Sequence, residues 1–145
     1  MLESNEFHLR RGAGEIIIAG AGGEQLGQIH ISGRTLAFIS ISKVCQVHEA
    51  GHSPLVFSVI AGFLGRRAEV RDAEDSRVGF LEGKRILDWW RRPVFYLDQK
   101  RFLGPSSEVV ATLSPSGSTV SLRIEPILHG EPFAKMLLLA HVIAR

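Results

Sequence analysis

The 145-residue chain has the length of one domain, and 45% of its residues are hydrophobic, which excludes an intrinsically disordered protein. Its 17 Lys and Arg residues against 15 Asp and Glu leave a formal net charge of +2, too small an excess for a dedicated nucleic-acid-binding domain. The single cysteine excludes an internal disulfide and favours a reducing compartment. No apolar run reaches the roughly 20 residues that a bilayer requires, and the first residues lack the apolar core of a secretory signal. We therefore expect a cytoplasmic protein.

Most of the chain before residue 124 has the pattern of short β-strands, in which apolar and polar residues alternate. A turn is predicted at Gly33-Arg34, and Gly, Pro, Ser and Asp residues separate the other strands. Strands that recur about every ten residues predict a closed or sandwiched antiparallel sheet in a single domain over residues 1–145. The predicted strands are residues 15–19, 25–32, 35–42, 43–47, 55–61, 68–71, 78–81, 94–97, 109–113 and 119–124.

Two parts of this predicted sheet share one layout. Each has a strand, a polar turn and an apolar-Gly-x-apolar sequence, at Leu26-Gly27-Gln28-Ile29 and at Val78-Gly79-Phe80-Leu81. Two ordinary hairpins or a duplicated half-barrel would both produce this pattern, and the sequence leaves both open.

One clear helix is predicted, over residues 131–145. At 100° per residue its apolar side chains cover nearly the whole circumference, interrupted only by Lys135 and His141. A helix that is apolar on all sides has to be enclosed on all sides, and this one is too short to cross a membrane. We therefore predict a mainly β fold: an antiparallel β-barrel of about 10–12 strands that encloses the C-terminal hydrophobic helix.

Three segments carry a family resemblance. Residues 54–59, the hairpin at 67–80 with its Asp-rich turn, and the last strand, Pro126 loop and helix at 122–140 resemble the tubby C-terminal-like superfamily, which includes phospholipid scramblases and plant LURP-one-related proteins. The match covers residues 44–145, and the first third fits by strand count. The resemblance implies a non-enzymatic barrel that binds phosphoinositide or other lipid headgroups. No functional residue of the family transfers to a position here, and the acidic calcium segment and cysteine cluster of scramblases are absent.

A second hypothesis starts from His48-Glu49-Ala50-Gly51-His52, an H-E-x-x-H sequence. On a helix, the two histidines would hold Zn²⁺ and the glutamate would activate the bound water. Gly51 and Pro54 are poor helix residues, and the preceding residues 39–47 have a strand pattern, so a hairpin turn at 49–54 is the preferred interpretation. A third ligand at a recognisable spacing is missing, although Glu69, Glu74 and His129 are candidates.

The strongest candidate for binding is the segment 84–101, which combines basic side chains with both tryptophans and the only tyrosine. Basic side chains are attracted to anionic lipid, and Trp and Tyr favour the headgroup layer. The alternatives are that a tryptophan caps the core while the charges are solvated, or that the segment stacks single-stranded nucleic acid, which the near-neutral chain opposes. The candidate headgroup-binding residues are Lys84, Arg85, Trp89, Trp90, Arg91, Arg92, Lys100 and Arg101.

Other conspicuous residues have structural interpretations. Cys45 is expected to be a buried apolar side chain, His141 a hydrogen-bonded core histidine, and Gly20-Ala21-Gly22-Gly23 a turn. No Ser-His-Asp set is evident. The leading hypothesis is a non-enzymatic domain without a cofactor that binds anionic phospholipid or a membrane surface peripherally, and no nucleic acid. The alternatives are a small zinc metallopeptidase using His48, Glu49 and His52, and a protein-interaction or structural barrel.

Overall fold

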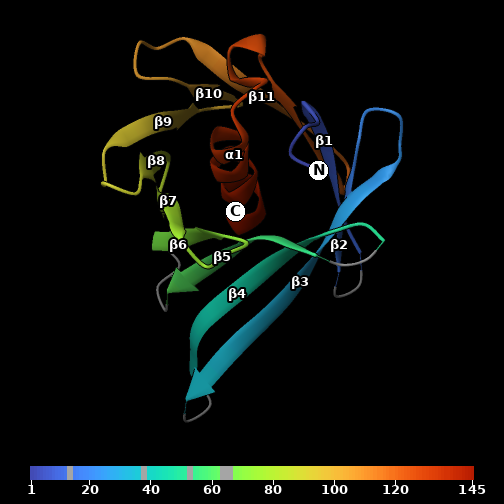
Figure 1. Ribbon diagram of the computed structural model, residues 1–145, viewed down its shortest axis with the longest axis vertical. Coiled ribbons are helices and arrows are strands. Elements are labelled where there is room, and N and C mark those ends of the chain that lie inside the picture. The colour runs from blue at the N-terminus through green and yellow to red at the C-terminus, as the bar shows by residue number, and fades with distance from the viewer. Residues whose placement is uncertain (13–14, 37–38, 52–53, 63–66) are drawn as a thin grey trace.

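The computed structural model describes residues 1–12, 15–36, 39–51, 54–62 and 67–145. Within these ranges, twelve strands form one closed antiparallel barrel in which each strand pairs with its neighbours in sequence, and β1 pairs with β12 to close the ring. The predicted barrel of antiparallel strands is therefore confirmed (Figure 1). The strands are β1 (Glu6–Arg11), β2 (Ile16–Ala19), β3 (Gln25–Leu36), β4 (Ile39–Glu49), β5 (Leu55–Gly62), β6 (Arg67–Asp72), β7 (Arg77–Glu82), β8 (Arg85–Asp88), β9 (Pro93–Asp98), β10 (Arg101–Leu103), β11 (Val109–Ser116) and β12 (Thr119–Ile124).

The C-terminal helix lies in the centre of the barrel. A short 3-10 helix, η1 (Pro126–Leu128), leads into α1 (Pro132–Ala144), which the strands surround (Figure 1). Every residue of α1 from Lys135 to Ile143 is buried. Because all faces of the helix are apolar, burial on all faces removes the most hydrocarbon from water. The predicted enclosure of the helix is confirmed.

Four strands and one turn differ from the sequence prediction. The sequence pattern predicts no strand at β1, β8 or β10. The strand predicted at residues 35–42 is wrong, because residues 35–36 end β3 and residues 39–42 begin β4. The turn predicted at Gly33-Arg34 is also wrong. Gly33 and Arg34 lie within β3, where they pair with Lys43 and Ser42 of β4. A Gly-Arg pair is compatible with a turn but does not require one, and here the ladder continues through it. β3 and β4 consequently form one long hairpin, which extends beyond the barrel (Figure 1).

The repeated apolar-Gly pattern has a packing explanation. A Cβ atom on Gly79 would lie 2.8 Å from Leu137 Cδ2 of α1 and would also collide with the Leu87 carbonyl oxygen. A Cβ atom on Gly27 would lie 2.6 Å from the His48 carbonyl oxygen and 2.8 Å from Met1 Sδ. Both glycines thus allow other parts of the chain to approach the sheet more closely than any side chain would permit.

The two polar residues of the enclosed helix are both hydrogen-bonded. Lys135 Nζ donates to the carbonyl oxygens of Leu2 at 2.9 Å and Ser4 at 3.0 Å, and burial lowers the pKa of this amine. His141 Nε2 lies 2.9 Å from the Gly83 carbonyl oxygen, so that nitrogen carries the proton and donates. The predicted hydrogen-bonded core histidine is confirmed. Each polar side chain of α1 therefore ties the helix to a different part of the surrounding chain.

The close contact at Gly79 leads to a stability prediction. Gly79→Ala should lower the free energy of unfolding by about 1 to 3 kcal/mol, because the added methyl group overpacks the contact between the sheet and α1. Urea denaturation followed by circular dichroism measures this change. Gly130→Ala is the matched control, since a Cβ atom there meets no atom within 4 Å. Equal stability of the two variants would contradict the proposed contact.

The burial of His141 leads to a prediction about pH. Burial lowers the pKa of this imidazole, so the folded chain holds it neutral while the unfolded chain protonates it below about pH 6.5. Stability should therefore fall as the pH drops from about 7.5 to about 5.5, and His141→Gln should reduce that loss. Urea midpoints at the two pH values test this. The exposed His30, changed to Gln, should leave the pH dependence intact; an unchanged slope in His141→Gln would contradict the assignment.

Candidate functional site

The structure divides the predicted basic and aromatic residues between the two ends of the β8–β9 pair. The Leu97 amide donates to the Lys84 carbonyl oxygen at 2.8 Å, which places the β7–β8 turn beside the end of β9. Residues 89–92 connect the opposite ends of the same strands. One group is thus Trp89, Trp90, Arg91 and Arg92, hereafter the tryptophan turn, and the other is Lys84, Arg85, Lys100 and Arg101.

Asp88 organises the tryptophan turn. Its Oδ1 accepts the amides of Trp90 and Arg92, both at 2.9 Å, and its Oδ2 accepts Arg92 Nε at 2.9 Å. The Asp88 amide and carbonyl also close the turn by bonding to the Arg92 carbonyl and the Arg91 amide. Aspartate is favoured where a side chain accepts amides two or more residues ahead. Burial alone would raise the pKa of Asp88, but the hydrogen bonds from Arg92 and Trp90 together lower it.

The turn presents its aromatic side chains to solvent. Trp89 is 54% exposed and Trp90 is 60% exposed, and their ring centroids lie 4.1 Å apart at an interplanar angle of 31°. The Arg92 guanidinium lies 4.5 Å from the Trp90 ring centroid, and that of Arg91 lies 4.2 Å from the Phe80 ring centroid. The two exposed indole rings, one of them packed against the Arg92 guanidinium, form an amphipathic surface.

The positive charge of the predicted residues is partly neutralised. Arg92 pairs with Asp88 at 2.9 Å, Arg85 with Glu82 at 2.7 Å, and Arg101 with Asp98 at 3.8 Å. Among the residues that the structure describes, no carboxylate pairs with the three remaining cations. One unpaired cation therefore belongs to the tryptophan turn and two to the other group: Arg91, Lys84 and Lys100.

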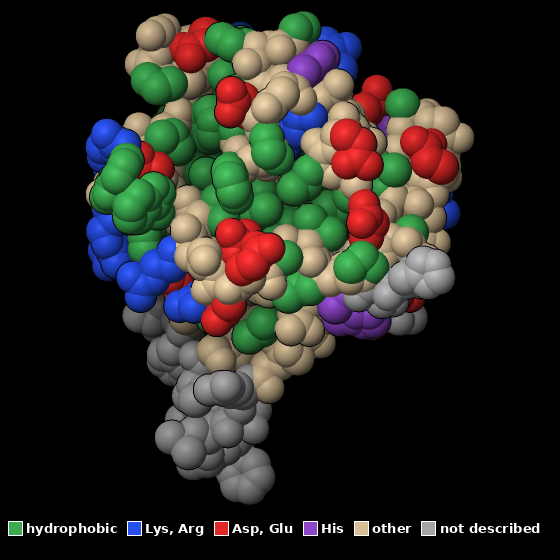
Figure 2. All heavy atoms as spheres, viewed as in Figure 1, with side chains coloured by type: hydrophobic (Ala, Val, Ile, Leu, Met, Phe, Trp, Pro, Cys, Tyr) green, Lys and Arg blue, Asp and Glu red, His purple; other side chains and the backbone are tan. Residues whose placement is uncertain are grey.

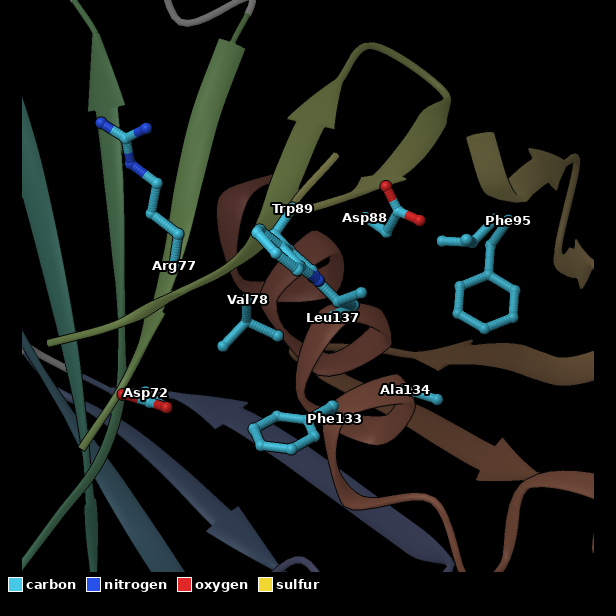
Figure 3. A pocket seen from close by; sticks show the side chains of 10 residues that line it. Asp72, Arg77, Val78, Asp88, Trp89, Phe95, Phe133, Ala134 and Leu137 are labelled. Atoms are coloured by element: carbon cyan, nitrogen blue, oxygen red, sulfur yellow. The ribbon is translucent and has the colours of Figure 1, made fainter. Parts of the chain in front are cut away.

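An apolar pocket of about 350 Å³ adjoins the tryptophan turn. It lies between the β6–β7 turn, the β8–β9 turn and the start of α1, and Figure 3 shows Trp89, Val78, Leu137 and Phe133 around it. Phe133, at the start of α1, is 57% exposed. Figure 2 shows apolar side chains gathered over the middle of one face of the barrel, with Lys and Arg side chains along one edge. Trp89 therefore lines an open pocket and does not seal the core.

The described part of the H-E-x-x-H sequence, residues 48–51, does not lie on a helix. His48 and Glu49 belong to β4, and the Glu49 amide donates to the Pro54 carbonyl oxygen at 2.9 Å across the β4–β5 connection. The predicted hairpin is confirmed by the β4–β5 pairing, whereas His52 lies outside the described residues. The Glu49 carboxylate accepts the Met1 amine at 2.6 Å. Over the described ranges, no three His, Cys, Asp or Glu side chains form a group that could hold a metal ion.

A hydrogen-bonded Glu-His-Ser chain escaped the sequence analysis. Glu6 Oε1 lies 3.0 Å from His8 Nε2, and His8 Nδ1 lies 2.6 Å from Ser121 Oγ. The register of β1 on β12 places His8 opposite Ser121 although 113 residues separate them, so no local signal could reveal the contact. Ser121 lies on β12, which pairs with β1 on one side and β11 on the other, a setting unlike the exposed pair of N–H groups that an oxyanion hole requires. We interpret the chain as cross-strand polar pairing.

Two smaller sequence predictions are confirmed. Cys45 is 4% exposed, and burial raises the pKa of its thiol, which disfavours the reactive thiolate. The glycine cluster connects β2 to β3 as a turn, closed by the Gly23 amide on the Gly20 carbonyl oxygen at 3.1 Å. Both segments thus have the structural roles that the sequence predicts.

The fold has a counterpart of known structure. No protein-family model matches the sequence, and a search of curated proteins gives no match. The X-ray structure of the Arabidopsis thaliana protein AT5G01750 is similar, with a TM-score of 0.62 over 97% of this chain and 91% of that chain. The identity is 14%, so the likeness concerns the fold alone. Within the described ranges, no helix combines the length and apolar character needed to cross a membrane.

Asp88 provides a test of how the tryptophan turn is held. Asp88→Ala removes three acceptor contacts and should lower the free energy of unfolding by about 1 to 2 kcal/mol. It should also increase the mobility of the indole rings, which is measured as a lower tryptophan fluorescence anisotropy. Because the folded-state pKa is lowered, the contribution of Asp88 should be present at neutral pH and disappear as the pH falls below about 4. Asp98→Ala is the control, and an equal anisotropy in both variants would contradict the role of Asp88.

Proposed function

We propose that this protein is a non-enzymatic domain of the tubby C-terminal-like type that binds the surface of membranes rich in anionic phospholipid. The observation that carries the proposal is the tryptophan turn, where two exposed, stacked indoles lie beside the unpaired cation Arg91. The family part of the proposal is supported by the closed barrel around an apolar helix. The Arabidopsis protein supports the fold only.

The chemistry of the turn suits the interface between headgroups and hydrocarbon. Indole rings partition to the headgroup layer, and a basic side chain near an anionic bilayer contributes about 1 kcal/mol. The Arg92 guanidinium is held against Asp88 and Trp90, so we assign the electrostatic part mainly to Arg91 and the apolar part to Trp89 and Trp90. Such a contact is weak and reversible, as expected of peripheral binding.

The acidic β6–β7 turn, which borders the pocket together with the tryptophan turn, limits how the molecule can approach a membrane. The β6–β7 turn carries the exposed residues Glu74 and Asp75, of which Asp75 pairs with Arg71 at 3.3 Å. An anionic surface would repel this turn. We therefore propose that the tryptophan turn approaches the membrane first, with the barrel tilted so that the β6–β7 turn remains in water.

Vesicle co-sedimentation tests the proposal. The protein should bind vesicles that contain phosphatidylserine more strongly than neutral vesicles, and binding should weaken as salt screens the charges. Trp89→Ala with Trp90→Ala should reduce the affinity by roughly tenfold, and Arg91→Gln by about fivefold at low salt. Lys84→Gln is the matched control, because it removes an unpaired cation at the opposite end of β8.

Three results would count against the proposal. Equal binding to neutral and anionic vesicles would remove its electrostatic part. Loss of binding in Lys84→Gln but not in Arg91→Gln would move the surface to the other end of β8–β9. No binding to either vesicle would leave a protein-interaction or structural barrel.

A further inference from the structure

The apolar pocket beside the tryptophan turn has walls made of hydrocarbon and aromatic rings. Its volume of about 350 Å³ falls at the low end of the range of about 300–1,000 Å³ typical of small-molecule sites. That size suits a short stretch of one aliphatic chain and excludes a two-chain lipid. The apolar lining residues come from β7, the tryptophan turn, β9 and α1 (Figure 3): Val78, Trp89, Val94, Phe95, Phe133 and Leu137.

The polar groups at the edge of the pocket are already occupied. Asp72 Oδ1 accepts the amides of Glu74 at 3.0 Å and Ser76 at 2.9 Å, and both carboxylate oxygens of Asp88 are engaged within the tryptophan turn. Arg77 is paired with Glu69, and its side chain is directed away from α1 (Figure 3). A sugar or nucleotide would lose its hydrogen bonds to water here without replacement. The pocket therefore selects an apolar ligand.

Of the two carboxylates that line the pocket, Asp88 pairs with Arg92 and Asp72 accepts amides of its own turn; a cation without a carboxylate partner in the described ranges lies outside the lining. Arg91 follows directly after the two tryptophans, and its guanidinium rests on the Phe80 ring without a carboxylate partner in the described part of the chain. An amphiphile whose apolar chain enters the pocket beside Trp89 would leave its polar head outside, and Arg91, two residues further along the tryptophan turn, is the unpaired cation of that turn. Coulomb attraction then favours an anionic head over a cationic one.

We propose that the pocket takes one acyl chain of an anionic lipid, which lies between Trp89 and Phe133 and against Val78 and Leu137 while the headgroup meets Arg91. This inference rests on the proposed membrane binding and gives it a chemical specificity. The domain would bind an acyl chain that leaves the bilayer, in addition to the anionic surface of the membrane. Trp89 and Phe133 are each more than half exposed without a ligand, so an acyl chain between them would remove apolar surface from water on both sides.

Methyl NMR with sodium decanoate, a soluble single-chain anionic probe used below its micelle concentration, tests the pocket without a membrane. The resonances of Val78, Val94 and Leu137 should shift in a saturable way. Each methylene added between hexanoate and decanoate should increase the affinity by about fourfold until the pocket is full. Decyltrimethylammonium has the same chain with the opposite charge, and should bind more weakly.

A variant that fills the pocket separates the acyl site from the membrane surface. Ala134 lines the pocket and is only partly buried, so Ala134→Leu should occupy the ligand's volume and weaken decanoate binding by roughly tenfold. The same protein should still bind phosphatidylserine vesicles through Trp90 and Arg91, with reduced affinity. The Val78 and Leu137 methyl signals, together with circular dichroism, report whether the variant keeps the native fold. Val94→Phe fills the pocket from β9 and serves as a second, independent variant.

The outcomes distinguish the two proposals. Absence of pocket shifts with decanoate, or undiminished binding in both filled variants, overturns the acyl site whether or not vesicles bind. Equal affinity for decanoate and decyltrimethylammonium overturns the assignment of an anionic head. Saturable decanoate binding by a protein that ignores all vesicles overturns the membrane function and, with it, the bilayer as the source of the chain.

Discussion

In water, a helix without a polar face is stable only where other parts of the protein enclose it on all sides. The nine consecutive buried residues of α1 from Lys135 to Ile143 satisfy this condition because the strands surround them. The helix in turn fills the interior that a ring of this many strands would otherwise leave hollow. An isolated helix of this length is marginally stable in water, so α1 depends on the surrounding strands, and the strands depend on α1 to fill the interior. The polar contacts of α1 and the pocket beside its first turn both follow from this packing of the helix inside the barrel.

The two polar side chains of α1 show what the enclosure costs and how the chain compensates. A buried ammonium group is strongly unfavourable unless oxygen atoms replace water around it, and the carbonyl oxygens of Leu2 and Ser4 do this for Lys135. His141 avoids the cost by remaining neutral and donating to Gly83. One contact holds the segment before β1 and the other holds the β7–β8 turn. The polar residues of the helix thus connect it to the chain at separate places, which a purely apolar helix could not do.

The sequence predicted the architecture well because the decisive signals are local. Period-two alternation and the apolar circumference of residues 131–145 both arise from spacing within a few turns or strands. The features that the sequence predicted wrongly depend on pairing between strands. Residue types alone predict a turn at Gly33-Arg34, but these residues pair with Lys43 and Ser42 and therefore continue β3. The strand β10 contains only 3 residues, too few for a periodic pattern to be recognised.

The same distinction explains why the binding segment was recognised but its geometry was not. Charge and aromaticity are properties of composition, so residues 84–101 were conspicuous, whereas the β8–β9 hairpin that carries Trp89–Arg92 to one end and Lys84, Arg85, Lys100 and Arg101 to the other is a property of pairing. The Glu6-His8-Ser121 chain and the pocket beside Trp89 were invisible for the same reason, because their residues come together only when distant strands and α1 pack.

Within the closed ring, each strand pairs with a neighbour on both sides, and the interior here is filled by a helix. Little chemistry can therefore take place along the strands or inside, which leaves the turns at the two mouths and the side chains around them. Where α1 begins, Phe133 and Trp89 border the apolar pocket, and each is more than half exposed. The helix that fills the interior thus leaves, beside its first turn, an apolar surface that the chain itself does not cover.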